Sequence, residues 1–200
     1  MPNDNSSMRQ PSEAALLLAS ASPRRAELLG TLLDDYEVRP AGIDESQAPG
    51  EAPETYVQWL AGEKALAIGR MESGRWVIGS DTVVVLDGHY LGKPVDAGQA
   101  RAMLRAISGR SHRVYSAVAL LGPDGACETA LSVTDVYFAT LPETWIMRYV
   151  DSGEPMDKAG AYAIQGGAAA WIVRIEGSYS GVVGLPLYET AALLRAAGLL

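Results

Sequence analysis

Short apolar runs alternate with amphipathic stretches along most of this chain, and the alternation predicts its first elements. Leu16–Ala19 has the pattern of a buried strand, and Pro23 suits the first turn of a helix that continues to Leu33. A second short strand is expected at Tyr36–Arg39. From Pro53 to Ile68 apolar residues recur at helical spacing, which predicts an amphipathic helix with Lys64 bordering or interrupting its apolar face.

The middle of the chain predicts a hairpin followed by a capped helix. In "RWVIGSDTVVVLDGHYLGKP" two strand-like runs flank Asp87-Gly88, a pair typical of a two-residue hairpin turn. Asp96 is a suitable N-cap for the next helix, and Gly109 a suitable stop. Two further strands are expected within "HRVYSAVALLG" and "ETALSVTDVYFATL".

The last third predicts a short helix after Pro142, a glycine-rich strand region over 159–178 and a final helix from Leu187 to Ala197. Strands and helices alternate without a strict repeat, so we predict an α/β fold with a mixed twisted sheet flanked by helices on both faces. Residues 1–13 are polar and unpatterned and are expected to form a flexible tail, which leaves 14–200 as a single domain.

Composition and charge narrow the classes of partner. Apolar residues make up 48% and charged residues 20%, an ordinary globular composition. The net charge of −8 argues against nucleic acid and anionic membranes as partners, although screening over roughly 8 Å leaves room for a local basic site. Cys127 is the only cysteine, so an internal disulfide and a cysteine zinc site are excluded, and a cytoplasmic location is expected.

Two adjacent arginines, Arg24 and Arg25, stand where the first strand meets the first helix. Cations at a helix N-terminus oppose the helix dipole, and a bound anion would compensate for them. The alternative is that these arginines pair with Glu27 or other surface acids. The spacing alone leaves both interpretations open.

A few other polar residues stand out by their position. Asp81 interrupts an apolar strand, either as an aspartate bonded to local backbone or as a metal ligand or general base. Glu45, next to Asp44, offers the oxygen ligands that magnesium or manganese prefers. Lys93 follows the hairpin, and Gln165 precedes two glycines that allow close approach to the backbone.

Familiar catalytic motifs are absent from the sequence. It contains no GxxxxGK[ST] phosphate loop, no GxGxxG turn and no GxSxG elbow. With only His89 and His112, catalysis by histidine is not expected. The arginines, lysines and carboxylates at element junctions are instead the components of a metal-assisted phosphate site.

Eight segments resemble the Maf family of nucleoside triphosphate pyrophosphatases. They occur in family order from about Leu16 to Leu194: "LASASPRRAELL", "IDES", "AGEKA", "GSDTVV", "GKP", "SGRSHRVYSAVAL", "GEPMDKAGAYAIQG" and "GSYSGVVGLPLYET". The resemblance implies two lobes around a central cleft, a homodimer and hydrolysis between the α- and β-phosphates with a divalent cation, Mg²⁺ or Mn²⁺.

The resemblance also implies roles for individual residues. Asp81 would be the proton acceptor and, with Glu45, a metal ligand, while Lys93 and Glu45 would support catalysis. The substrate-binding residues implied by the motifs are Ser20, Arg24, Arg25, Lys64, Thr82 and Gln165. Arg24, Thr82 and Gln165 match the family positions associated with base selectivity.

The motifs "SPRR" and "AYAIQG" resemble the dTTP- and UTP-hydrolysing branch of the family. An amide such as that of Gln165 accepts from N3–H of uracil or thymine and donates to O4, whereas a carboxylate only accepts and suits guanine. The expected activity is therefore hydrolysis of dTTP and UTP, with removal of modified pyrimidine nucleotides as an associated role. A 7-methyl-GTP pyrophosphatase and a nucleotide-binding regulator of cell division with little turnover are the alternatives.

Overall fold

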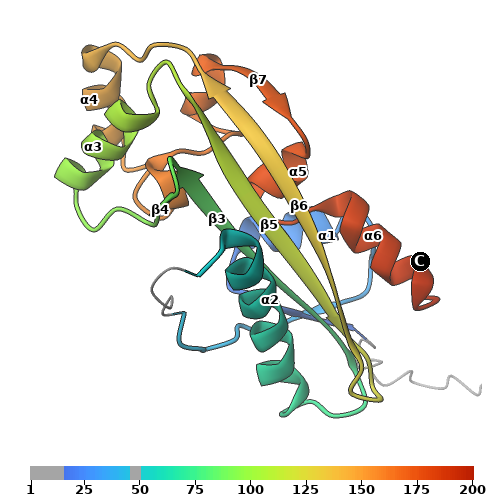
Figure 1. The fold of residues 1–200 in the computed structure, drawn as a ribbon. Coiled ribbons are helices and arrows are strands. Elements are labelled where there is room, and N and C mark those ends of the chain that lie inside the picture. Colours follow the sequence, from blue (N-terminus) through green and yellow to red (C-terminus); the bar gives the residue numbers. More distant parts are fainter. Residues whose placement is uncertain (1–15, 46–50) are drawn as a thin grey trace, which may run out of the picture.

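A mixed β-sheet organises the residues that the computed structural model describes, which are 16–45 and 51–200 (Figure 1). Within these residues its strand order is β2-β1-β3-β5-β6-β7, with β4 also paired to β3. The strands are β1 (Leu16–Ala19), β2 (Glu37–Val38), β3 (Trp76–Leu86), β4 (His89–Leu91), β5 (Ser111–Leu121), β6 (Cys127–Phe138) and β7 (Ile172–Glu176). The predicted tail, 1–13, lies outside the described residues.

Two strands share one edge of β3 and leave part of it uncovered. β1 pairs in parallel with 76–79, and β4 pairs antiparallel with 84–86, while β5 occupies the other edge. Among the described residues, no strand pairs with 80–83 on the edge that β1 and β4 share. Polar groups of this stretch can therefore face a ligand instead of a neighbouring strand.

Helices cover both faces of the sheet, as predicted. They are α1 (Pro23–Leu29), α2 (Pro53–Gly69), α3 (Ala97–Ile107), α4 (Glu143–Asp151), α5 (Tyr179–Val183) and α6 (Leu187–Ala196). The helix α2 packs against β1, β3 and β5 on one face, and α1 and α6 contribute to a core on the other. Because β1 lies between both cores, its four residues are all buried, which explains its unbroken apolar pattern.

The two ends of the long strands carry different sets of helices (Figure 1). At one end α3 and α4 enclose a core with the chain around 159–168, and at the other α1, α2 and α6 surround β1. This is the two-lobed arrangement that the family resemblance implies. Among the described residues, no helix combines the length and the apolar character needed to cross a bilayer.

Two predictions of secondary structure were wrong. The first helix ends at Leu29 instead of Leu33, because the chain turns at its C-cap, Gly30, and continues in i to i+3 turns. In the glycine-rich segment 159–178 only β7 is a strand, and the segment before it contains two 3₁₀ turns, η1 (Ala159–Ala161) and η2 (Gly167–Trp171). Gly160 has φ +74°, which is incompatible with an extended strand.

His112 is buried in the core formed by β5, α4 and the first 3₁₀ turn. Its Nε2 lies 2.8 Å from the Tyr162 hydroxyl, and its Nδ1 has no hydrogen-bond partner among the described residues. Burial lowers the pKa of His112 to about 4. The imidazole is therefore neutral in the folded protein at pH 7, in keeping with a structural role.

The buried His112 predicts that the protein loses stability in mild acid. Below an unfolded pKa of about 6.5, the unfolded chain binds a proton that the folded chain excludes until about pH 4. Between pH 7.5 and pH 5 this residue should therefore remove about 2 kcal/mol of stability. Urea unfolding at both pH values measures the loss, which His112→Gln should remove and His89→Gln, at an exposed position, should preserve. An equal loss in wild type and His112→Gln would contradict this account.

Candidate active site

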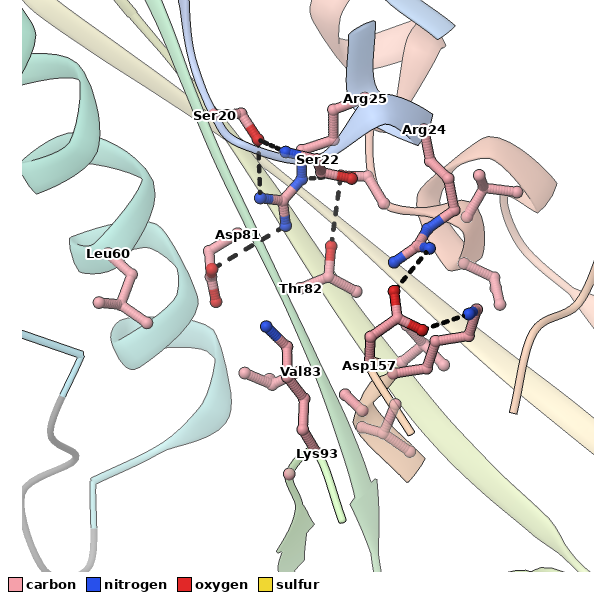
Figure 2. Close-up of a pocket in the computed structure, with 18 of the residues that line it drawn as sticks. Ser20, Ser22, Arg24, Arg25, Leu60, Asp81, Thr82, Val83, Lys93 and Asp157 are labelled. Carbon is pink, nitrogen blue, oxygen red and sulfur yellow. Dashed lines mark hydrogen bonds and ion pairs between the residues drawn. The ribbon is translucent and has the colours of Figure 1, made fainter. Parts of the chain in front are cut away.

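A cleft of about 620 Å³ opens along the uncovered edge of β3 (Figure 2). Its walls come from the β1–α1 loop, from β3, from the segment after β4 and from chain segments around 157–165 and 182–184. The volume lies within the range of small-molecule sites. Neither His89 nor His112 lines the cleft.

The cleft is basic although the chain as a whole carries a net charge of −8. Among the described residues, its charged lining side chains are Arg24, Arg25, Lys64, Lys93, Lys158, Glu45, Asp81 and Asp157. Five of them are cationic and three anionic, so the local excess is positive. The cleft is therefore suited to a small anion with several charges.

Lys64 lies between two carboxylates in the cleft. Its ammonium donates to Asp81 Oδ1 at 2.6 Å and lies 2.7 Å from Glu45 Oε1. Lys64 and Asp81 are only 6% and 7% exposed, so each requires a partner of opposite charge. Asp81 is therefore ion-paired with Lys64. It is not an aspartate whose carboxylate is bonded only to local backbone, which was one interpretation of the sequence.

Close packing of α2 on β3 brings Lys64 to Asp81. A Cβ at Gly79 would lie 2.0 Å from the carbonyl oxygen of Ala61 and 2.8 Å from the nitrogen of Ala65. Only glycine fits at this position, and the lysine follows one helical turn after the point of closest approach. The burial of Lys64 thus confirms that this residue interrupts the apolar face of α2.

Arg25 lies on the other side of Asp81, with its Nη2 3.9 Å from Asp81 Oδ1 (Figure 2). Its Nε donates to the carbonyl oxygen of Gly184 at 2.8 Å, and its Nη1 lies 3.5 Å from Ser20 Oγ. Burial lowers the pKa of Arg25, opposed by the charges of Asp81 and Glu45. Arg25 is thus a cation held in place inside the cleft, and Ser20 contributes to holding it.

The carbonyl group of Gly184, which the sequence did not single out, connects Arg25 to β3. It also accepts from Ser80 Oγ at 3.1 Å and from Thr82 Oγ1 at 3.4 Å. Thr82 Oγ1 lies 2.7 Å from Ser116 Oγ as well, so its side chain is fixed on both sides. Gly184 has φ +136°, a conformation that favours glycine.

Glu45 and Lys93 complete the charged part of the cleft. Partial burial alone would raise the pKa of Glu45, but Lys64, Lys93 and Arg25 together hold this pKa below its ordinary value. Tyr56 donates to the backbone carbonyl of Glu45 at 2.6 Å and fixes the loop. The ammonium of Lys93 points toward Asp81 (Figure 2), and within the described part of the chain no ion pair engages it.

At the opposite end of the cleft Arg24 pairs with Asp157. Its Nη1 lies 3.3 Å from Asp157 Oδ2, and Lys158 Nζ donates to Asp157 Oδ1 at 2.5 Å (Figure 2). Arg24 thus has an acidic partner, in line with the second interpretation of the two arginines, although this partner is Asp157 and not Glu27.

Gln165 lines this end of the cleft with an exposed side chain. Asp157 and Lys158 belong to the segment "GEPMDKAGAYAIQG", but neither was predicted from the sequence to be a site residue.

The carboxylates of Asp81 and Glu45 fit a hard divalent cation. Both lie within hydrogen-bonding distance of the Lys64 ammonium, so carboxylate oxygens from two segments of the chain lie close to each other. Among the described residues, no group of three or more His, Cys, Asp or Glu side chains is arranged to hold a metal. Two carboxylates suit Mg²⁺, which commonly takes its remaining ligands from water and substrate phosphates.

A positively charged cleft with two converging carboxylates, at the uncovered edge of a mixed sheet, defines a site for a small polyanion. The chain belongs to the Maf family: the family model described as Maf-like protein matches residues 15–197. This membership confirms the resemblance found in the sequence.

Relatives of similar length carry a specific activity in their names. A dTTP/UTP pyrophosphatase of Hahella chejuensis is 48% identical, with coverage of 94% of this chain and 95% of that protein. A dTTP/UTP pyrophosphatase of Myxococcus xanthus is 51% identical, with 94% of each chain covered. A HAM1 protein of Coxiella burnetii has the same fold, with a TM-score of 0.52, 17% identity and coverage of 90% and 98%.

Gly79→Ala should separate α2 from β3 and displace Lys64 from Asp81. Because the new methyl group meets backbone atoms, we expect a loss of about 1–3 kcal/mol in the free energy of unfolding. Gly62→Ala is the matched control, since Gly62 lies on α2 and a Cβ there meets nothing within 4 Å. Removing the flexibility of Gly62 should stabilise the protein by roughly 0.5–1 kcal/mol. Urea unfolding compares the two variants, and equal stabilities would refute the close-packing argument.

Proposed function

We propose that this protein is a nucleoside triphosphate pyrophosphatase that hydrolyses dTTP and UTP to the nucleoside monophosphate and pyrophosphate. The observation that carries the proposal is the convergence of Asp81, Lys64, Arg25 and Lys93 on one cleft, from four separate segments of the chain. The names of relatives about half identical over nearly the whole chain support the same activity.

The charged end of the cleft is suited to the triphosphate. Arg25, Lys64 and Lys93 are the cations that hold the phosphate oxygens and neutralise the charge that develops during transfer. Asp81 accepts the proton of the water that attacks the α-phosphorus, and the bond to the β-phosphate oxygen breaks to release pyrophosphate. Asp81 and Glu45 would hold a divalent cation, Mg²⁺ or Mn²⁺, which supplies Lewis-acid polarisation of the phosphate when bound.

The opposite end of the cleft is suited to the base. Arg24 and Gln165 line this end, whereas Thr82 lines the cleft next to Asp81, and the family resemblance associates all three with base selectivity. The Gln165 amide donates to O4 and accepts from N3–H of uracil or thymine, so it satisfies both groups at once. The names of the relatives favour this specificity over that for 7-methyl-GTP.

Three expectations from the sequence remain predictions. They are the cytoplasmic location, the homodimer and the role in removing modified pyrimidine nucleotides. A nucleotide-binding regulator would bind UTP tightly and release little pyrophosphate. Robust release of pyrophosphate from UTP that depends on Mg²⁺ or Mn²⁺ distinguishes the enzyme from such a regulator.

Asp81→Asn should lower kcat for UTP by about 10²–10⁴-fold, because an amide cannot accept the proton of water. Pyrophosphate release at saturating Mg²⁺ measures the effect. Asp135→Asn on β6, outside the cleft, is the matched control and should retain wild-type turnover. If Asp81→Asn retained more than about a tenth of wild-type kcat, Asp81 would not be the general base.

Gln165→Glu should weaken the use of UTP and dTTP relative to GTP and 7-methyl-GTP. A carboxylate cannot donate to O4 of a pyrimidine, so kcat/KM for UTP should fall by about tenfold or more. Measurements of kcat/KM with UTP, dTTP, CTP, GTP and 7-methyl-GTP test this, with Gln58→Glu on α2, outside the cleft lining, as the control. An unchanged ranking of substrates would show that Gln165 does not recognise the base.

A further inference from the structure

The turn that carries Gln165 is held on both sides by two residues outside it. Two positions before Gln165, the backbone N–H of Ala163 donates to the Tyr149 hydroxyl at 3.1 Å. Two positions after it, the backbone N–H of Gly167 donates to Glu154 Oε1 at 3.0 Å and to Oε2 at 3.3 Å. The two external residues are joined, because Tyr149 donates its hydroxyl hydrogen to Glu154 Oε1 at 2.8 Å.

Close packing strengthens this arrangement. A Cβ at Gly166 would lie 1.9 Å from Glu154 Oε1, so the backbone next to Gln165 runs directly over the carboxylate. Tyr149 itself is only 5% exposed, and its ring stacks on Trp145 with the centroids 4.7 Å apart. The anchor of the turn is therefore a rigid aromatic side chain of α4 and not a surface group.

The hydroxyl of Tyr149 uses both of its hydrogen-bonding capacities in this arrangement. Burial raises the pKa of Tyr149, so the hydroxyl stays protonated and donates to the carboxylate. Its oxygen at the same time accepts from Ala163, and the bond to an ionised acceptor is the stronger type. Loss of the hydroxyl would leave the amide of Ala163 and the carboxylate of Glu154 each without one partner.

The segment from Tyr149 to Lys158 also positions Arg24, the other side chain at this end of the cleft. Lys158 Nζ donates to the backbone carbonyl of Glu154 at 2.7 Å and to Asp157 at 2.5 Å. Asp157 in turn contacts Arg24 at 3.3 Å. Both Arg24 and Gln165, which come from distant parts of the sequence, are therefore positioned by the stretch from Tyr149 to Lys158.

We propose that Tyr149 and Glu154 are positioning residues for base recognition, which hold the backbone of Gln165 where its amide meets the edge of a pyrimidine. They touch neither the phosphates nor the base and act through the turn at 163–167. The inference rests on the proposed role of Gln165. The test distinguishes a failure of the positioning role from a failure of base recognition by Gln165.

The test compares UTP with ribose 5′-triphosphate, which keeps the sugar and the phosphates but lacks the base. The ratio of their kcat/KM values isolates the contribution of the base, and a general loss of stability or of phosphate binding affects both substrates alike. Tyr149→Phe, Glu154→Ala and Gln165→Ala are measured singly, and Tyr149→Phe is also combined with Gln165→Ala. Tyr137→Phe is the matched control, because its hydroxyl contacts Glu176 outside the cleft.

We expect Gln165→Ala to lower the UTP to ribose triphosphate ratio by about tenfold, and Tyr149→Phe and Glu154→Ala to lower it by a similar factor. The double variant should have the same UTP to ribose triphosphate ratio as Gln165→Ala alone, because both changes remove the same interaction with the base. Tyr137→Phe should leave the ratio unchanged. If Tyr149→Phe failed to fold, Glu154→Ala would provide the same comparison.

Two results would overturn the inference in different ways. If Gln165→Ala lowered the ratio and both Tyr149→Phe and Glu154→Ala left it at the wild-type value, Gln165 would recognise the base without help from these residues. If Gln165→Ala itself left the ratio unchanged, the proposed base recognition by Gln165 would fail, and the positioning role would fail with it.

Discussion

The architecture of the active site depends on one interaction, the ion pairing of the Lys64 ammonium with Asp81 and Glu45. A lysine and an aspartate that are almost fully buried would each be strongly destabilising alone, and each makes the other tolerable. Loss of one partner from such a buried pair typically costs about 3–5 kcal/mol. The fold meets this requirement through the absence of a side chain at Gly79, which allows α2 to approach β3.

The topology of the sheet turns this ion pair into a site. Because β1 and β4 pair with separate halves of one edge of β3, the residues between them face a cleft instead of another strand. Arg25, Lys64 and Lys93 surround Asp81 at one end of the cleft, and Arg24 and Gln165 lie at the other. A protein of net charge −8 thereby presents a locally positive cleft, in which three carboxylates pair with four of the five cations among the described residues.

Much of this could be predicted from the sequence, because the decisive signals are local. An aspartate in an apolar strand and a lysine on an apolar helical face are each unusual, and the helix and strand periodicities positioned both correctly. The strand predicted around Gly160 was wrong, since an apolar, glycine-rich composition does not show which glycines adopt positive φ.

Other contributors could not be found from local pattern. Asp157 meets Arg24 across 133 positions, and the carbonyl of Gly184 meets Arg25 across 159. A backbone carbonyl carries no signal in the sequence at all. Tyr149 and Glu154 act through backbone amides, so their identity gives no indication of which residue they position.

Hydrolysis of UTP in ¹⁸O-labelled water, followed by mass spectrometry of the products, tests the central claim most directly. If the cleft holds the triphosphate with the α-phosphorus beside Asp81, the products are labelled UMP and unlabelled pyrophosphate. Release of UDP and inorganic phosphate, or recovery of the label in pyrophosphate, would contradict the account.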